Sequence, residues 1–410
     1  MLISCGAFKK TQPVIWPEDD IIVVTPTKDK DLPEKEDKPK VEEKNKEALV
    51  YSMVTFKGEE YKVPVHKKDF EIAVLLPFHT DSVNSSIDKR RSDVMLEYLQ
   101  GMKLAVSEIE KLQSSFKIRY FDTDNDTNKL KTLLKKSVIE NADLIIGPTD
   151  EDQVIIAAYF AKKREIPLLS PMTTLNKLWS DNPYVFFLNP SDQMQAMEFL
   201  RYFKENHKDE KLLIVRDGKY FDKTFGKALV DECIAQKIEF EKVAYSKYLK
   251  WENHLGAEKT VIVHTTQSKT NLTFSVSGLL AKSDKITLIG SDKWMEFSNI
   301  DYGQLERLSV TYLSTSKAQV PNELSTGLIR NYRGMYKGVP SWHTYMGYDQ
   351  LLFACETLDA FGKYFPIFIE GKALNYSNSN MEFKKTSSCF QNKYLQLYQL
   401  RDREIIPFYK

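Results

Sequence analysis

Short apolar runs alternate with stretches of helical periodicity through much of the chain. Residues 71–78 form a nearly continuous apolar run that ends in Pro77 and Phe78, as is typical of a strand buried on both faces. Apolar residues then recur at spacings of four and three, at Met95, Leu99, Met102, Val106 and Ile109. Similar strand-like runs lie at 116–121, 143–146, 166–170, 211–215, 240–245, 260–263 and 286–290, and similar helical patterns at 128–140, 151–164, 192–206 and 222–236.

This alternation of strands and helices predicts right-handed βαβ units and parallel sheets. The pattern starts again after Asn189-Pro190, so the chain contains two such series. Two series predict an α/β protein with two Rossmann-like lobes. Ligands of open α/β sheets bind outside the carboxyl ends of the strands, and the expected site is therefore the cleft between the lobes.

The first 69 residues have a different pattern, with little to pack. Residues 28–47 contain seven Lys and eight Asp or Glu, and their large aliphatic residues are Leu32 and Val41. Such a segment cannot bury enough apolar area to offset the entropy lost on ordering. Residues 11–69 are therefore predicted to be a charged, disordered tether. The short run at 21–24 is too short to cross a membrane, and could pack as a strand or on a partner.

Cys5 stands in a short motif, Leu2-Ile3-Ser4-Cys5, within residues 1–10. The motif resembles a bacterial lipobox, in which the cysteine becomes lipid-modified. The basic and apolar segments that normally precede a lipobox are absent before Met1, so either the start is shortened or the likeness is accidental. A free N-terminal cysteine is the alternative. A lipid at Cys5 followed by the tether would anchor the folded body to a membrane.

Composition excludes several classes of function. Lys and Arg number 58 against 57 Asp and Glu, and this balance argues against a broad nucleic-acid-binding surface. The phosphate-loop, dinucleotide, zinc-protease and serine-hydrolase motifs are missing, and the six histidines show no metal-ligand spacing. The sequence thus predicts neither an enzyme nor a cofactor or metal. Four cysteines exclude a disulfide scaffold, but leave open a bridge from Cys389 to Cys233 or Cys355.

Several segments resemble the type I periplasmic-binding-protein superfamily, which includes the branched-chain amino-acid receptors. They are Ile72–Phe78 (IAVLLPF), Gly101–Val106 (GMKLAV), Ile145–Pro148 (IIGP), Ile166–Pro171 (IPLLSP), Gly290–Asp292 (GSD) and Tyr345–Asp349 (YMGYD). Leu96–Gly101 (LEYLQG) followed by Asp122-Thr123 resembles a group of Bacteroidota lipoproteins in which a LysM module often precedes a similar domain. In this chain the tether occupies the place of that module. The resemblance covers about residues 70–410.

The resemblance implies that the chain crosses between the lobes three times. Lobe I is expected at 70–190 plus 317–370, and lobe II at 191–316 plus 371–410. The hinge would then lie near Asn189–Ser191, at Thr315-Ser316, and after Phe368. The aromatic-rich tail from Tyr394 to Tyr409 is expected to close lobe II, or to form a protein contact if it is exposed.

The resemblance also implies candidate ligand-binding residues on lobe I. In amino-acid receptors the loop after the Gly-Pro strand offers a hydroxyl to the ligand carboxylate, and Thr149 occupies that place. Three acidic residues follow it, and the alternative to a ligand-binding role for this loop is that they cap the next helix. The next loop provides Ser170, Thr173 and Thr174. His79 closes the first strand where a cleft loop begins, or is a solvated loop side chain.

On lobe II the resemblance implies two further residues. Tyr220 lies where the family covers its ligand with an aromatic ring, or else packs on the lobe surface. Asp292 is positioned like the acidic residue that pairs with a ligand ammonium group, although the adjacent Lys293 could neutralise it. These departures put a standard α-amino acid in doubt as the ligand.

Two hypotheses of function follow. The first is a lipid-anchored, non-enzymatic envelope protein that binds a small polar ligand, amino-acid-like or peptide-like, in the cleft between the lobes. The second is a protein-binding scaffold or regulatory subunit of an outer-membrane or peptidoglycan machine, with a degenerate cleft. Both place the folded body in the periplasm and the anchor in the outer membrane.

Overall fold

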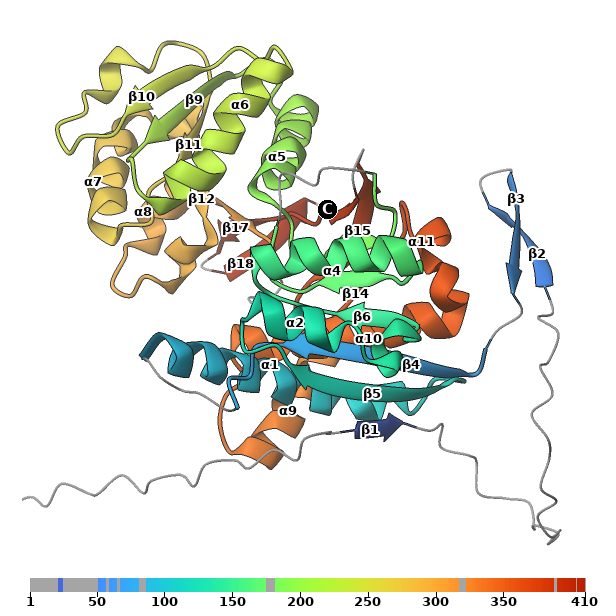
Figure 1. The fold of residues 1–410 in the computed structure, drawn as a ribbon. Coiled ribbons are helices and arrows are strands. Elements are labelled where there is room, and N and C mark those ends of the chain that lie inside the picture. The colour runs from blue at the N-terminus through green and yellow to red at the C-terminus, as the bar shows by residue number, and fades with distance from the viewer. Residues whose placement is uncertain are drawn as a thin grey trace, which may run out of the picture.

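A computed structural model describes residues 21–24, 51–56, 59–64, 67–80, 86–174, 181–316, 322–386, 389–402 and 404–409. Figure 1 shows two α/β lobes, one built mainly from the first half of the chain and the other mainly from residues 192–314. Cys5 and the rest of the lipobox-like segment lie outside the described residues.

The first lobe contains a nine-stranded sheet in the described part of the chain, with strand order β1-β5-β4-β6-β7-β8-β16-β15-β14. Neighbours from β5 to β16 run parallel, whereas β1, β15 and β14 pair antiparallel. The strands are β1 (Ile21–Val24), β4 (Asp69–Leu76), β5 (Ser115–Asp122), β6 (Leu144–Ile146), β7 (Leu168–Ser170), β8 (Val185–Phe187), β14 (Ala373–Asn375), β15 (Asn380–Lys385) and β16 (Phe390–Asn392).

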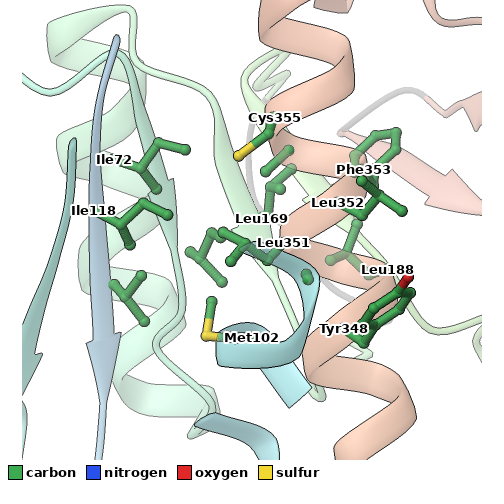
Figure 2. Packing of buried hydrophobic residues seen from close by; sticks show 14 of the residues in the cluster. Ile72, Met102, Ile118, Leu169, Leu188, Tyr348, Leu351, Leu352, Phe353 and Cys355 are labelled. Atoms are coloured by element: carbon green, nitrogen blue, oxygen red, sulfur yellow. The ribbon is translucent and has the colours of Figure 1, made fainter. Parts of the chain in front are cut away.

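Alternate residues of each strand face opposite sides of this sheet, and each side has its own core. Ile72 and Ile118 face the side covered by α1 (Ser86–Ile109), α9 (Glu323–Tyr336), α10 (Trp342–Phe361) and α11 (Phe365–Phe368). Figure 2 shows these two side chains directed toward Met102 of α1 and Cys355 of α10. The other side is covered by α2 (Thr127–Leu133), α3 (Ser137–Glu140) and α4 (Glu151–Arg164).

Helices α1 and α10 pack unusually close, because glycine occupies both sides of their contact. A Cβ atom on Gly101 would lie 1.9 Å from the Thr344 carbonyl oxygen, and one on Gly347 would lie 1.9 Å from the Tyr98 carbonyl oxygen. Larger residues would force the helices apart. This contact fixes α1 on the sheet, and so fixes the first turns of α1 that extend beyond the sheet edge.

The second lobe contains a seven-stranded sheet in the described residues, with order β10-β9-β11-β12-β13-β17-β18. The strands are β9 (Lys211–Arg216), β10 (Glu241–Ala244), β11 (Thr260–His264), β12 (Ile286–Ser291), β13 (Thr311–Ser314), β17 (Gln396–Arg401) and β18 (Glu404–Tyr409). One face packs on α5 (Asp192–Asn206), the π-helical turn η1 (Asp222–Gly226) and α6 (Lys227–Ala235). The other packs on α7 (Lys269–Leu279), α8 (Tyr302–Arg307) and the short 3-10 turns η2 (Trp251–Asn253), η3 (Leu280–Lys285) and η4 (Asp292–Glu296).

The third crossing between the lobes differs from the prediction. Residues 371–410 were expected in lobe II, but β14, β15 and β16 complete the sheet of the first lobe. Only β17 and β18 join the second sheet, so the chain crosses between Asn392 and Gln396 rather than after Phe368. Aromatic packing explains the difference, since Phe390 stacks on Phe186 with centroids 4.6 Å apart, and Phe383 meets the same ring edge-on at 5.3 Å.

Three strands lie within the predicted tether. Strand β1 pairs antiparallel with β5, from Ile21 opposite Arg119 to Val24 opposite Phe116, and forms the edge of the first sheet. The 21–24 run therefore packs as a strand, which was one of its two predicted roles. Strands β2 (Tyr51–Phe56) and β3 (Glu59–Pro64) pair with each other as a two-stranded hairpin. The charged segment 28–47 lies outside the described residues.

The three described cysteines are free thiols in three separate cores. Cys389 is 2% exposed and packs with α4 on one side of the first sheet, whereas Cys355 packs on the opposite side. Cys233 belongs to the second lobe. The possible bridge from Cys389 to either of the other two is therefore wrong, because a layer of sheet or a whole lobe separates the partners.

Candidate functional site

An open pocket of about 630 Å³ lies at the carboxyl edge of the first sheet. The loops after β4, β5, β6 and β7 meet there because parallel strands end at the same edge. Each of its described lining residues lies between Pro77 and Met172, and so belongs to the first lobe. It is the edge of the first sheet at which the strand order predicts a ligand to bind.

The first turns of α1 supply one side of the pocket. Ile87, Arg90, Arg91, Val94 and Met95 have spacings that place them on one face of a helix. Met95 is buried in the core, Val94 packs partly against it, and the two arginines and Ile87 are exposed. The stripe therefore has a buried apolar end at Met95 and an exposed end that carries Ile87 and the two arginines.

Loops after three strands supply the opposite side, through Asn125, Thr149, Asp150 and Met172. Asp150 is the N-cap of α4, and its carboxylate accepts a hydrogen bond of 3.2 Å from the Asp152 amide. Of the three acidic residues after Thr149, Asp150 caps the helix, as the alternative interpretation of this loop predicted, and Glu151 and Asp152 lie in its first turn. Thr149 itself is half-buried and lines the pocket.

Hydroxyl groups of the loop after β7 are used within the protein. Ser170 is fully buried, and its hydroxyl donates to the Thr173 carbonyl at 3.3 Å. The Thr173 hydroxyl donates to the Thr149 carbonyl, which ties the two loops together. Thr174 is half-buried. Of the hydroxyl residues proposed on lobe I, Thr149 lines the pocket, whereas Ser170 and Thr173 support the loops around it.

Asp122, at the end of β5, holds the loop that carries His79. Its carboxylate accepts hydrogen bonds of 2.7–3.2 Å from the amides of Phe78, His79, Thr80 and Asp124 and from the Thr80 hydroxyl. Burial alone would raise the pKa of Asp122, but the bonds from Thr80 and Asp124 and the charge of Lys129 outweigh it, and the pKa is lowered. Asp122 is therefore a fixed anion that organises the edge of the first lobe.

His79 is buried within this loop network rather than solvated. Its backbone has a left-handed φ of 54°, and its Nδ1 lies 2.8 Å from the Asp124 carboxylate. The side chain is 5% exposed. His79 therefore lies behind the pocket wall, where it supports the loop that contains Asn125.

Asp292 lies at the matching edge of the second sheet. Its carboxylate accepts hydrogen bonds from the hydroxyls of Ser314 at 2.6 Å and Ser291 at 3.2 Å, both at strand ends. Burial, with a smaller contribution from Glu296, raises its pKa although the two serines act in the opposite direction. Lys293 has an exposed side chain, and only its backbone amide joins the cluster, by donating to the Ser291 hydroxyl.

Tyr220 is 78% exposed on the loop after β9. The loop is held from below, since Asp222 pairs with Arg216 and accepts the Gly218 amide at 2.9 Å. Gly218 has a φ of 72°, which favours glycine. The ring of Tyr220 is therefore carried by a fixed loop and free of packing on its own lobe.

A buried polar cluster around Asp349 of α10 lies beside the second crossing between the lobes. Its carboxylate accepts the amides of Ser377 and Asn378, both at 2.9 Å, and the Ser377 hydroxyl at 2.5 Å. Asn378 in turn accepts the Ser316 hydroxyl at 2.8 Å. The Ser316 carbonyl accepts the hydroxyl of Tyr398, from β17, at 2.9 Å. These bonds link Ser316, at the second crossing, to the first lobe through Asn378 and to the second lobe through Tyr398.

Sequence reasoning did not single out Arg90 and Arg91. A signal was present, because Lys89, Arg90 and Arg91 are consecutive cations near the start of α1, and the amino-terminal end of a helix favours negative charge.

The described residues contain no group of three or more His, Cys, Asp or Glu side chains arranged to hold a metal ion. None of their helices is both long and apolar enough to cross a bilayer.

Comparison with known proteins supports the two-lobe fold. Residues 91–248 match the family model described as periplasmic binding protein. Among solved structures, an ABC transporter substrate-binding protein from Desulfitobacterium hafniense in complex with Leu is 18% identical, with a TM-score of 0.50, and the match covers 83% of this chain and 100% of that one. No curated protein matches the chain.

Two further structures give the same result. A branched-chain amino acid ABC transporter periplasmic ligand-binding protein from Burkholderia xenovorans is 9% identical, with a TM-score of 0.51 and coverage of 83% and 94%. A Rhodospirillum rubrum protein that carries the name of a branched-chain amino acid ABC transporter is 10% identical, with a TM-score of 0.59 and coverage of 83% and 100%. The chain therefore has the two-lobed fold of type I periplasmic binding proteins, and this confirms the predicted fold class.

Proposed function

We propose that the chain is a non-enzymatic binding protein whose lobes close on a small polar ligand, amino-acid-like or peptide-like. The observation that carries the proposal is the pocket at the carboxyl edge of the first sheet, since this edge is where open α/β folds bind ligands. The half-buried carboxylate of Asp292 at the carboxyl edge of the second sheet supports it, since its pKa is raised by loss of solvent. The Desulfitobacterium hafniense protein of the same fold was crystallised with leucine.

Closure of the lobes completes the site in this proposal. The described pocket residues all belong to the first lobe, so a ligand bound there still has an open side. Rotation about the three crossings brings the second lobe over it and favours the closed state by the contacts that only this state makes. Asp292 then accepts a cationic or hydrogen-bond-donating group, Thr149 offers its hydroxyl, and the exposed ring of Tyr220 covers the ligand.

A ligand screen tests the proposal. Thermal unfolding is measured with amino acids, di- and tripeptides and muropeptides, and each stabilising compound is then titrated calorimetrically. A ligand at 100 times its Kd adds about 2.7 kcal/mol to the free energy of unfolding, which is easily detected. Asp292→Asn should weaken binding, whereas Glu252→Gln, on an exposed turn of the same lobe, should not. Absence of any stabilising compound would contradict the proposal.

A scaffolding role in an outer-membrane or peptidoglycan machine is the second candidate. It is favoured by aromatic side chains exposed on three segments of the second lobe, namely Tyr220 at 78%, Tyr248 at 77% and Phe274 at 52%. Co-purification from detergent-solubilised envelopes should then recover a stoichiometric partner that a triple alanine variant of these residues loses. A protein that purifies alone in both forms argues against this role.

We further propose that a lipid on Cys5 anchors the chain to the outer membrane, with the folded body in the periplasm. The support is the lipobox-like motif and the charged segment after it, which would separate anchor and body. The Bacteroidota likeness is part of this proposal. Growth of producing cells with a clickable fatty acid should label the wild type but not Cys5→Ser. An unlabelled wild-type protein would rule the anchor out.

A further inference from the structure

The place where the family binds a carboxylate is poorly suited to an anion in this chain. Asp150 already caps the start of α4, and Glu151 and Asp152 follow in its first turn. These three carboxylates oppose a negative ligand group beside Thr149. A negatively charged ligand needs another binding point in the pocket.

Arg90 and Arg91 provide such a point on the other side of the same pocket. Both guanidinium groups are exposed and line it, and no ion pair joins either of them to another described residue. The described lining thus contains two guanidinium groups against the single carboxylate of Asp150. Arginine binds carboxylates and other oxyanions in a two-pronged geometry, and two adjacent arginines can share one anion.

Apolar side chains lie directly beside these cations. Val94 and Met95 follow the arginines on the same helical stripe, and Met172 faces them from the loop after β7. A fully hydrated ion such as inorganic phosphate would leave this wall uncovered. An organic anion would bury it while its charged group remains at the rim.

We propose that the ligand of this pocket is an organic anion with an apolar body, and that Arg90 and Arg91 bind its anionic group. The inference rests on the proposed function and narrows its ligand class. Acidic or apolar amino acids with a free carboxylate fit it, as do short peptides ending in such residues. Amides and esters of the same compounds do not. The second lobe then contacts the rest of the ligand through Asp292.

A pair of fluorescent probes tests this inference without knowledge of the natural ligand. The first is 8-anilinonaphthalene-1-sulfonate, and the second is N-phenyl-1-naphthylamine, which has the same apolar body without the sulfonate. The wild type should bind the sulfonate saturably and more tightly than the neutral amine. In the double variant Arg90→Gln/Arg91→Gln the Kd of the sulfonate should rise about tenfold or more, because charge-assisted hydrogen bonds are lost, while that of the amine stays unchanged.

Lys89→Gln is the matched control, because Lys89 is an exposed cation of the same helical turn that lies outside the described lining. It should change the Kd of the sulfonate less than about twofold, since it keeps both hydrogen-bonding arginines. Circular dichroism shows whether each variant is folded, and all the exchanged residues are exposed. Equal loss in the control and the double variant, or no saturable binding of the sulfonate, would overturn the inference.

The outcome is separable from that of the proposed function. If amino acids or peptides bind in an Asp292-dependent manner while the arginine variant binds the sulfonate normally, the proposed function stands and the inference fails. If binding of the sulfonate depends on the arginines but no amino acid or peptide stabilises the protein, the pocket binds anions and the proposal of an amino-acid-like ligand is wrong.

Discussion

Each lobe has an aspartate at the carboxyl end of a strand, Asp122 in β5 and Asp292 directly after β12, and the two have opposite properties. Asp122 of the first lobe accepts hydrogen bonds from several amides of its own and the neighbouring loop, and its pKa is lowered. Asp292 of the second lobe accepts two serine hydroxyls, and burial raises its pKa. The same residue type at equivalent sheet edges is therefore a stable structural anion in one lobe and an incompletely stabilised acid in the other.

The difference shows how to distinguish a structural carboxylate from a candidate binding residue. A carboxylate whose lone pairs are occupied by backbone amides has little capacity left for a ligand. A carboxylate whose charged form is destabilised by burial is stabilised when a cation or hydrogen-bond donor binds to it, because that group replaces the lost solvation by water. The second lobe is therefore expected to respond to ligand through Asp292, whereas Asp122 holds the shape of the first lobe.

Asp122→Ala should have the largest effect. It leaves the amides of Phe78, Thr80 and Asp124 without their acceptor, so the free energy of unfolding should fall by about 3 kcal/mol or more in urea titrations. Asp126→Ala, in the same loop, removes only the N-cap of α2 and should cost about 1 kcal/mol. Equal losses in the two variants would show that Asp122 does not organise the loop.

Acid should affect the second lobe through His264, which is fully buried at the end of β11. Its Nε2 lies 2.9 Å from the Ser275 hydroxyl, and burial lowers its pKa to about 3. The unfolded chain binds a proton at this histidine more readily than the folded protein does. The contribution of neutral His264 to the free energy of unfolding is therefore fully present above pH 6.5, and it falls by up to about 1.4 kcal/mol per pH unit as the pH drops toward 3. Urea titrations of wild type and His264→Gln across this range measure the slope, which the variant should reduce.

Asp292→Asn should change stability by less than about 1 kcal/mol at pH 7, because the amide oxygen still accepts a serine hydroxyl. The sign follows from the pKa. Because the pKa of Asp292 is higher in the folded than in the unfolded state, the wild-type carboxyl stabilises the folded state at pH values below its unfolded pKa. This stabilisation is lost as the pH rises through the folded pKa. The free energy of unfolding of the variant should therefore increase relative to that of the wild type as the pH rises from acid to neutral. A loss as large as that of Asp122→Ala would remove the contrast between the lobes.

Tyr220→Ala should have the smallest effect on folding, because the ring is exposed and its loop is held by Asp222. We expect the free energy of unfolding to change by less than about 0.5 kcal/mol. Ligand titration distinguishes the two roles of the ring. If the ring covers the ligand, the variant should bind it more weakly, and if the ring is only a surface residue, binding should be unchanged.

The order of strands and helices in both lobes could be predicted because it depends on local periodicity. Buried strands such as Ile72–Leu76 and helical stripes such as Met95 to Ile109 fall where the apolar pattern places them. The last forty residues were harder, since their short aromatic strands fit either sheet. Their division between the sheets depends on Phe186, about two hundred residues earlier, which stacks on Phe390. No local pattern contains that pairing.

The candidate site shows the same division. The alternation of strands and helices by itself predicted a site at the carboxyl edges of the sheets, because parallel strands end at one edge. The resemblance to type I periplasmic binding proteins added the loops of Thr149, Tyr220 and Asp292 as candidates. Only the tertiary structure decided which side chains are available there. Ser170 and Thr173 are engaged by neighbouring loops, whereas Arg90 and Arg91 reach the pocket because α1 extends beyond the sheet. The physical reason is that hydrogen bonding and burial depend on neighbours distant in sequence.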